Sequence, residues 1–206
     1  MATFLESVVP QEESLAIPDV PIWRLSVAQY HQMIEAGIFT DDDPVELLEG
    51  WLVTKMTKNP PHILSTLLTS KALAEILPSG WFISSQEPFT TLNSEPEPDV
   101  MVVRGTERDY SQRHPQANEV GLVVEVANSS LQRDRTLKLR IYVAAGIPTY
   151  WILNLQERQL EVYTEPSGKG AAAIYAARRD YTASESIPVM LNGEAIGQIN
   201  LSDLLP

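Results

Sequence analysis

Cysteine is missing from this chain of 206 residues. Its absence excludes a disulfide framework and any thiolate metal site, and it suits a reducing compartment. Long apolar runs are missing too, because no stretch reaches the roughly 18 consecutive apolar residues of a membrane-spanning helix. The opening stretch, "MATFLESVVPQEES", also lacks the basic and apolar regions of a secretory signal. We therefore expect a cytoplasmic protein that does not associate with membranes.

Positive charge is scarce. The chain has 15 Lys and Arg residues against 27 Asp and Glu residues, a formal net charge of -12. This balance disfavours a broad phosphate-binding face, because nonspecific affinity for nucleic acid comes mostly from Lys and Arg. The acidic excess is concentrated in residues 1–50, whose net charge is -9, which leaves -3 for the remainder. One basic cluster is open to two interpretations, a nucleic-acid contact or a solvated helix face; its members are Arg133, Arg135, Lys138 and Arg140.

The composition favours a folded protein, since 44% of the residues are hydrophobic and 20% are charged. Residues 1–21 contain three prolines and four acidic residues but no basic residue, which predicts a flexible acidic arm. The run of Asp41, Asp42 and Asp43 is interpreted as a solvated turn. We expect residues 22–206 to form a single domain.

Two helices have well-marked starts. Ser26 and Gln29 fit a capping box for a helix in "SVAQYHQMIEAGIF". Ser129 and Gln132 fit a second capping box, for "SSLQRDRTLKLRIYVAAG", and Gly146 fits the position after that helix ends. Another helix is predicted in "PPHILSTLLTSKALAEIL", where the apolar face comprises Ile63, Leu67, Leu68, Leu73 and Leu77.

Short apolar runs between these helices predict strands. "VELLEGWLVTKM" reads as a hairpin around Gly50, and Asn192 with Gly193 marks a hairpin turn in the tail. Residues 61–155 have the order helix, strand, strand, strand, helix, strand. This order predicts a core that combines helices with a mixed sheet, an α/β (α+β) fold. An N-terminal helix with strands and a C-terminal β-hairpin region are expected to extend this core.

A carboxylate interrupts the apolar strand "GLVVEVAN" at Glu125, where an unpaired charge costs several kcal/mol. The alternation of a strand places Glu125 on the same face as Val123 and Ala127. Asp99 stands at the start of "PDVMVV", directly after Pro98. Two carboxylates on neighbouring strands repel each other unless a cation lies between them, and converging oxygen ligands suit Mg²⁺ or Mn²⁺.

Lys138 lies in the middle of the apolar stripe of the helix predicted at residues 130–145, if each residue turns the helix by about 100°. A lysine on a core-facing stripe needs a partner, because an unpaired buried ammonium is costly. One explanation is an i, i+4 pair with Asp134, which contributes roughly 0.2–0.5 kcal/mol. The other is that Lys138 reaches across to Glu125 through the space left by the small Ala127.

The "PD" at 98 and 99, a glutamate on the next strand and a lysine resemble the PD-(D/E)XK nuclease superfamily, whose core is helix, three strands, helix, strand. More closely, "VELLEGWLV", "EPDVMVV", "VVEVANSS" and "DRTLKLRIYVAAGIPTYWILN" resemble the Uma family of restriction-endonuclease-like proteins, often described as a domain of unknown function. The resemblance covers roughly residues 22–165. The superfamily's lysine normally follows the glutamate by two positions, where this chain has Ala127, and Lys138 is the position that matches this family.

The resemblance implies a role for each motif residue. Asp99 and Glu125 would bind a divalent metal ion, Mg²⁺ or Mn²⁺, and the main-chain carbonyl of Val126 would add a ligand. Lys138 would position or activate the attacking water. Glu46 matches another family position and is a candidate third carboxylate; the alternative is that it is one of many exposed acids near the N-terminus.

Three histidines and a glutamine complete the candidates. His62 matches a family histidine at the start of a helix, although a histidine there can also serve only to satisfy a neighbour. Gln86 is expected to line the same cleft. His31 and His114 are expected at the surface.

The function implied by this resemblance is a metal-dependent endonuclease that hydrolyses phosphodiester bonds, with DNA as the expected partner. The alternative is a catalytically inactive nuclease-fold protein that acts as a nucleic-acid-binding or protein-interaction module. A hydrolase of another phosphate ester also stays open, because fold does not fix substrate. Since cutting both strands usually needs two sites, a homodimer is considered as well.

Overall fold

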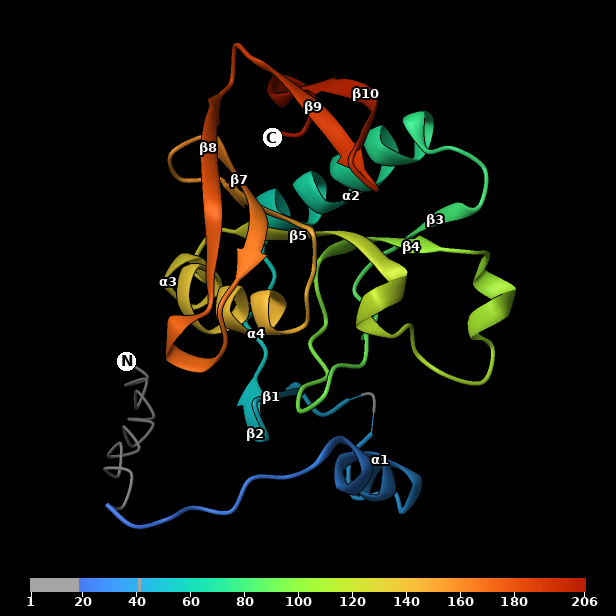
Figure 1. The fold of residues 1–206 in the computed structure, drawn as a ribbon, viewed down its shortest axis with the longest axis vertical. Coiled ribbons are helices and arrows are strands. Elements are labelled where there is room, and N and C mark those ends of the chain that lie inside the picture. The colour runs from blue at the N-terminus through green and yellow to red at the C-terminus, as the bar shows by residue number, and fades with distance from the viewer. Residues whose placement is uncertain (1–18, 41) are drawn as a thin grey trace, which may run out of the picture.

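The computed structural model describes residues 19–40 and 42–206 (Figure 1). Residues 1–18, which form most of the predicted acidic arm, and Asp41 of the predicted acidic turn lie outside the described residues. Among the helices of the described part, none is long and apolar enough to cross a membrane.

A six-stranded mixed sheet forms the centre, with the strand order β3-β4-β5-β6-β7-β8. The pair β5 and β6 is parallel, and every other neighbouring pair in this sheet is antiparallel. The helical segment between β5 and β6 provides the crossover that a parallel pair requires. The predicted mixed sheet is therefore confirmed, with strands β3 (Trp81–Ser84), β4 (Val100–Arg104), β5 (Val120–Ala127), β6 (Thr149–Asn154), β7 (Gln159–Ser167) and β8 (Ile174–Thr182).

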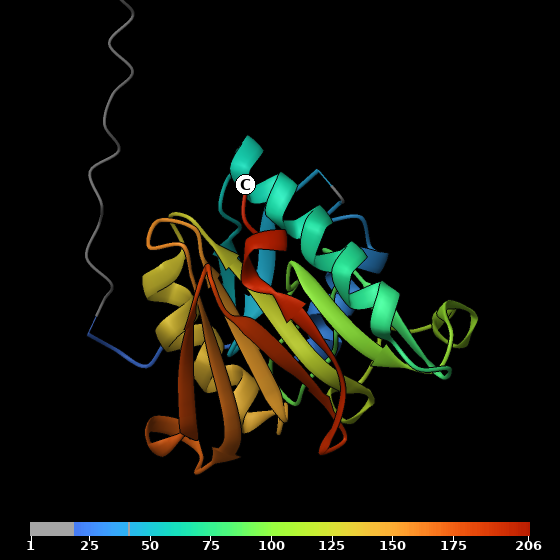
Figure 2. The ribbon, with the colours of Figure 1, turned by 90° about the horizontal axis from the view of Figure 1, so that it is seen from above.

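Both faces of the sheet are covered (Figures 1 and 2). Helix α2 (Pro60–Ile76) and the hairpin of β9 (Ser186–Leu191) and β10 (Glu194–Asn200) pack on one face. The segment from α3 (Leu131–Arg133) to α4 (Leu139–Ala144) packs on the other. Coverage of both faces explains why all eight residues of β5 are buried.

The N-terminal extension contains helix α1 (Val27–Glu35) and the hairpin of β1 (Val45–Leu48) and β2 (Trp51–Thr54). The predicted capping box of Ser26 and Gln29 is present. The hairpin is joined to the loop before β4 by a hydrogen bond from the Glu95 amide to the Leu47 carbonyl, 2.7 Å long. This bond fixes the position of Glu46, the neighbour of Leu47 on β1.

Helix α2 corrects one prediction. Ile63 and Leu67, predicted on the buried apolar face, are 45% and 63% exposed. The buried residues of α2 are instead Ser65, Thr66, Thr69 and Leu73. The C-terminal hairpin also approaches the end of α2 closely, because a Cβ atom added to Gly197 of β10 would lie 3.2 Å from Ile76.

The C-terminal hairpin turns at the predicted place. Asn192 and Gly193 connect β9 to β10 with φ angles of 51° and 82°. Two consecutive positive φ angles are typical of the type I′ turn that asparagine and glycine favour. This hairpin prediction is confirmed.

The helix after β5 is less regular than its sequence predicts. Its first helical residue is Leu131, and the N-cap is Ser130, whose side chain makes no capping hydrogen bond, so the predicted capping box of Ser129 and Gln132 is wrong. Residues Asp134–Lys138 form a π-helical segment between α3 and α4. A π segment is often found at functional sites, because it holds an extra residue in the turn and redirects side chains. Here both of its end residues, Asp134 and Lys138, are buried.

Candidate active site

Two neighbouring strands position the first pair of carboxylates. Asp99 directly precedes β4 and Glu125 lies in β5, and the pairing of Val100 with Val124 brings these positions together. The main-chain amide of Val126 donates a 2.8 Å hydrogen bond to Oδ2 of Asp99. The antiparallel register thus places both carboxylates at one end of the strand pair.

Lys138 connects the helical segment to these carboxylates. Its Nζ donates a 2.9 Å hydrogen bond to Oε1 of Glu125 and lies 3.6 Å from Oε2 of Glu46. The lysine is 3% exposed. Asp134, the alternative partner, instead accepts a 2.5 Å hydrogen bond from the hydroxyl of Ser130. The contact to Glu125 gives the buried lysine its partner across the sheet face.

Glu46 comes from the N-terminal hairpin and is 2% exposed, so the interpretation of it as an exposed acid is wrong. Besides its contact with Lys138, its Oε2 accepts a 3.2 Å hydrogen bond from the amide of Glu97. A residue far away in the sequence is thereby held beside Glu125. Its role in binding a metal ion stays a prediction.

His62 and Gln86 lie in the same region. His62, in the first turn of α2, has its Nε2 3.1 Å from Oδ2 of Asp99. Within the described residues, its Nδ1 is buried and has no hydrogen-bond partner. Gln86 lines the same cavity and has a φ angle of 60°. The structure therefore brings all the motif residues, and both of these residues, around one site.

The site is a cavity of about 60 Å³ in which negative charge exceeds positive charge. Four of the carboxylates that line it are at most 8% exposed, against one equally buried lysine. Burial of several like charges is costly unless a cation balances them. The four carboxylates belong to Glu46, Asp99, Glu125 and Asp134.

The pKa shifts have the same cause. Burial raises the pKa of Glu125 to about 8, although the charge of Lys138 opposes the rise. Burial likewise raises the pKa of Asp134. Burial alone would lower the pKa of Lys138, but the charges of Glu125 and Glu46 raise it above its usual value. The lysine therefore keeps its proton, and the raised pKa values of Glu125 and Asp134 reflect the cost of burying their negative charges.

The donor chemistry of the cavity fits a hard divalent cation, since carboxylate oxygens are the ligands that Mg²⁺ and Mn²⁺ prefer. In the part of the chain that the structure describes, no three His, Asp or Glu side chains are already arranged as a metal-binding group. Instead, Lys138 donates a hydrogen bond to Glu125, and His62 lies against Asp99. The residues fit such an ion in charge and donor type, and binding would require their side chains to adjust.

Several residues of the site were not identified from the sequence as part of it, among them Tyr142 and Asp134. Tyr142 donates a 2.5 Å hydrogen bond from its hydroxyl to Oε1 of Glu125, and burial raises the pKa of that hydroxyl. Asp134 lines the cavity and was considered only as a partner for Lys138. The signal was present in both cases, because Asp134 and Tyr142 each lie four residues from Lys138, where side chains share a helix face.

The two remaining histidines are only partly exposed. The side chain of His31 is 39% exposed, and its Nε2 lies 2.7 Å from Oε2 of the buried Glu95. His114 is 44% exposed, with its Nε2 3.7 Å from the same carboxylate. They lie at the surface as predicted, but both are held by a buried acid.

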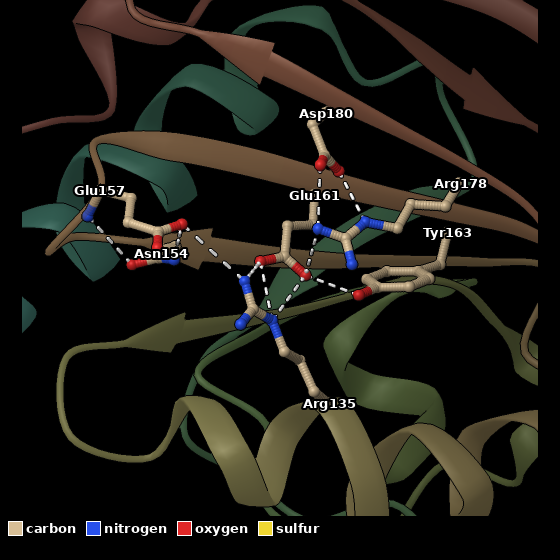
Figure 3. A network of polar contacts seen from close by, with 7 residues as sticks. All are labelled: Arg135, Asn154, Glu157, Glu161, Tyr163, Arg178 and Asp180. Atoms are coloured by element: carbon tan, nitrogen blue, oxygen red, sulfur yellow. Dashed lines mark hydrogen bonds and ion pairs between the residues drawn. The ribbon is translucent and has the colours of Figure 1, made fainter.

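The basic cluster predicted from the sequence is largely neutralised. Arg140 makes two 2.7 Å hydrogen bonds to Glu49, and Lys138 pairs with Glu125. Figure 3 shows that Arg135 reaches from the helix to Glu161 on β7. Three of the four cations thus form ion pairs within the protein. The cluster as a whole is therefore neither a solvated helix face nor a nucleic-acid contact.

Glu161 is fully buried between two arginines, Arg135 and Arg178 (Figure 3). The change Glu161→Gln should lower the free energy of unfolding by about 2 kcal/mol, because the two guanidinium groups would lose their shared counter-charge. This value is below that of a fully buried pair, since the arginine side chains are 32% and 41% exposed. Urea unfolding measures the difference.

The matched control is Asp180→Asn, which breaks an exposed pair with the same Arg178. It should cost less than about 1 kcal/mol. Equal losses in the two variants would show that Glu161 contributes no more than a surface acid.

Comparison with known proteins relates the chain to a sequence family and to solved structures. The sequence model of the Uma2 family, described as "Putative restriction endonuclease", matches residues 27–194. A similar solved structure is described as a "putative nuclease belonging to DUF820 from Anabaena variabilis ATCC 29413", with a TM-score of 0.62 and 12% sequence identity. The similarity covers 84% of this chain and 96% of that chain, and at this identity it shows the fold alone. A search of curated proteins found no match.

Proposed function

This chain belongs to the Uma2 family, and on that premise we propose that it is a divalent-metal-dependent endonuclease that hydrolyses phosphodiester bonds in DNA. The family and the fold support a nuclease-like function. The observation that carries the proposal is the small cavity in which four buried carboxylates face one buried lysine. A divalent cation would balance this excess of negative charge.

Asp99 and Glu125 would hold the metal ion, with Glu46 and the main-chain carbonyl of Val126 as further ligands. When bound, the ion would supply a Lewis acid that polarises a phosphoryl oxygen and lowers the pKa of bound water. This assignment is supported by the position of the oxygen donors, which come from the start of β4, from β5 and from the N-terminal hairpin.

The chain's own residues have distinct tasks. Lys138 keeps its proton on Nζ and offers a positive charge close to where negative charge develops on the phosphoryl oxygens. Tyr142 orients Glu125 through its hydroxyl. The amide of Val126 holds Asp99 from one side, and His62 lies against the same carboxylate. These contacts fix the side chains in a water-poor site, where charges interact strongly.

The alternative is a nuclease-fold module that binds nucleic acid without cutting it. One observation favours this alternative: Lys138 already neutralises Glu125, with its Nζ 2.9 Å from Oε1 of that carboxylate. The net charge of -12 does not favour either proposal strongly, because the acidic excess is concentrated near the N-terminus.

A cleavage assay distinguishes the two. The purified full chain, mixed with end-labelled single-stranded or duplex DNA, should produce shorter strands with Mg²⁺ or Mn²⁺ and none with EDTA. Gel separation of the products measures the rate. Persistent inactivity with every metal and substrate, while the DNA is still bound, would favour the binding module.

A further inference from the structure

Two cations at the cavity are not neutralised by acids. Lys58 lies in the connection between β2 and α2, and Arg133 is the last residue of α3; both line the cavity. Across residues 19–40 and 42–206, neither has a carboxylate within ion-pair distance. Both positive charges are therefore available to a ligand.

Arg133 is held in place while part of its guanidinium group is unused. Its Nη1 donates a 3.0 Å hydrogen bond to the carbonyl of Thr54 at the end of β2. Its Nε is buried and has no hydrogen-bond partner in the described part of the chain. A buried donor without a partner is costly, so an anionic oxygen at this rim would satisfy a group that the protein leaves unpaired.

The other cations near the cavity are occupied. Lys55 pairs with Glu97 at 2.6 Å, and Lys138 pairs with Glu125. Five carboxylates and four cationic side chains line the cavity, which gives a formal charge of -1 with His62 neutral. A bound divalent cation would make it positive, although the whole chain carries -12. With a divalent cation bound, the cavity can therefore accept phosphate groups although the protein as a whole is acidic.

We propose that Lys58 and Arg133 bind phosphate groups of the DNA strand that neighbour the phosphate at which the strand is cut. This proposal rests on the proposed function and adds the residues that position the substrate. Phosphate contacts fix the register of a strand without reading its bases. Lys58 would act as a point charge, and Arg133 would present the fork that matches two phosphate oxygens.

The test measures binding without cutting. The chain carrying Asp99→Asn serves as the reference, because it keeps both cations and removes one acid from the cavity; EDTA prevents cleavage. Lys58→Ala and Arg133→Met, each added to it, should weaken binding of a labelled DNA duplex roughly fivefold to tenfold at low salt. Each should also reduce the slope of log Kd against log salt by about 0.9, in duplexes of unrelated sequence alike. Fluorescence anisotropy over a salt series gives both quantities.

Matched controls remove the same charge elsewhere. Lys71→Ala on the exposed side of α2 and Arg158→Met after β6 should leave the affinity and the slope close to those of the reference. Thermal unfolding of each variant identifies any loss that comes from the Thr54 contact. Changes no larger in the cavity variants than in the controls, or no binding by the reference, would overturn the proposal.

The proposal and the proposed function can fail separately. The unsubstituted chain could cut DNA while the slope of log Kd against log salt does not change in the Lys58 and Arg133 variants. Phosphate binding by these residues would then be wrong, and the nuclease function would be supported. If the chain never cuts DNA, but its DNA binding depends on Lys58 and Arg133, the proposed hydrolysis is wrong and the proposed phosphate contacts are supported.

Discussion

Asp99→Asn should reduce DNA cleavage at least about a thousandfold and leave the protein folded. Loss of a metal-binding carboxylate removes several kcal/mol of transition-state stabilisation, and about 4 kcal/mol corresponds to a thousandfold in rate. The substitution keeps the shape of the side chain, and an amide oxygen can still accept the hydrogen bond from the Val126 amide. A direct effect on chemistry is therefore separated from an effect on structure.

The expected effect on stability distinguishes this variant from ordinary damage. Asp99 is one of four buried carboxylates around one lysine, so removal of its charge should leave the melting temperature equal or higher. A divalent metal ion should stabilise the unsubstituted chain, by about 2.7 kcal/mol at a hundred times its Kd, and stabilise the Asp99→Asn variant much less. Thermal unfolding with and without Mg²⁺ measures both.

Asp180→Asn provides the matched control, because the same chemical change is made at an exposed carboxylate. It should keep full cleavage and the full metal-dependent stabilisation. Cleavage by the Asp99→Asn variant at the rate of this control would show that Asp99 is not part of the catalytic site.

Lys138→Met should lower the free energy of unfolding by about 3–5 kcal/mol, because it leaves buried carboxylates without their protein cation. Methionine has a similar length, so the loss reflects charge more than packing. Glu125 and Glu46 lie 2.9 Å and 3.6 Å from the ammonium group and are both almost fully buried. Urea unfolding in EDTA measures the change without any contribution from a metal ion.

A double substitution distinguishes the contribution of the Lys138 charge to stability from its contribution to DNA cleavage. Lys138→Met combined with Glu125→Gln should recover a large part of the lost stability, because the amide carries no charge that needs a partner. The double variant should still fail to cut DNA. If Lys138→Met alone proved as stable as the unsubstituted chain, the lysine would not be the counter-charge of this cavity.

Local patterns in the sequence predict a large part of the fold. The capping box at Ser26 and the turn at Asn192 and Gly193 depend on neighbouring residues only, and both are confirmed. The strand alternation around Glu125 also predicts which side chains share its face, as the two apolar clusters show. Such features need no knowledge of the rest of the chain, because period and capping are set by backbone geometry.

Predictions failed where one pattern allows two packings. The apolar residues of α2 form a stripe, but Ile63 and Leu67 point to solvent, while small polar residues face the sheet. The spacing of apolar residues along a helix does not predict how closely that helix packs against the sheet. The capping prediction at Ser129 failed as well: the N-cap is Ser130, and its hydroxyl donates a hydrogen bond to Asp134, which lines the cavity.

The mixed sheet and the motif residues Asp99, Glu125 and Lys138 could be predicted from the sequence, as could the need of a buried lysine and a buried glutamate for partners. Which charged groups meet depends on the folded arrangement. Glu46 and Asp134 join the cavity, Tyr142 binds Glu125, and Arg135 and Arg140 pair with acids. A charged residue within an apolar stretch indicates, from the sequence alone, that its burial costs free energy unless it is paired. The partner that offsets the cost is fixed by distances between segments that only folding brings together.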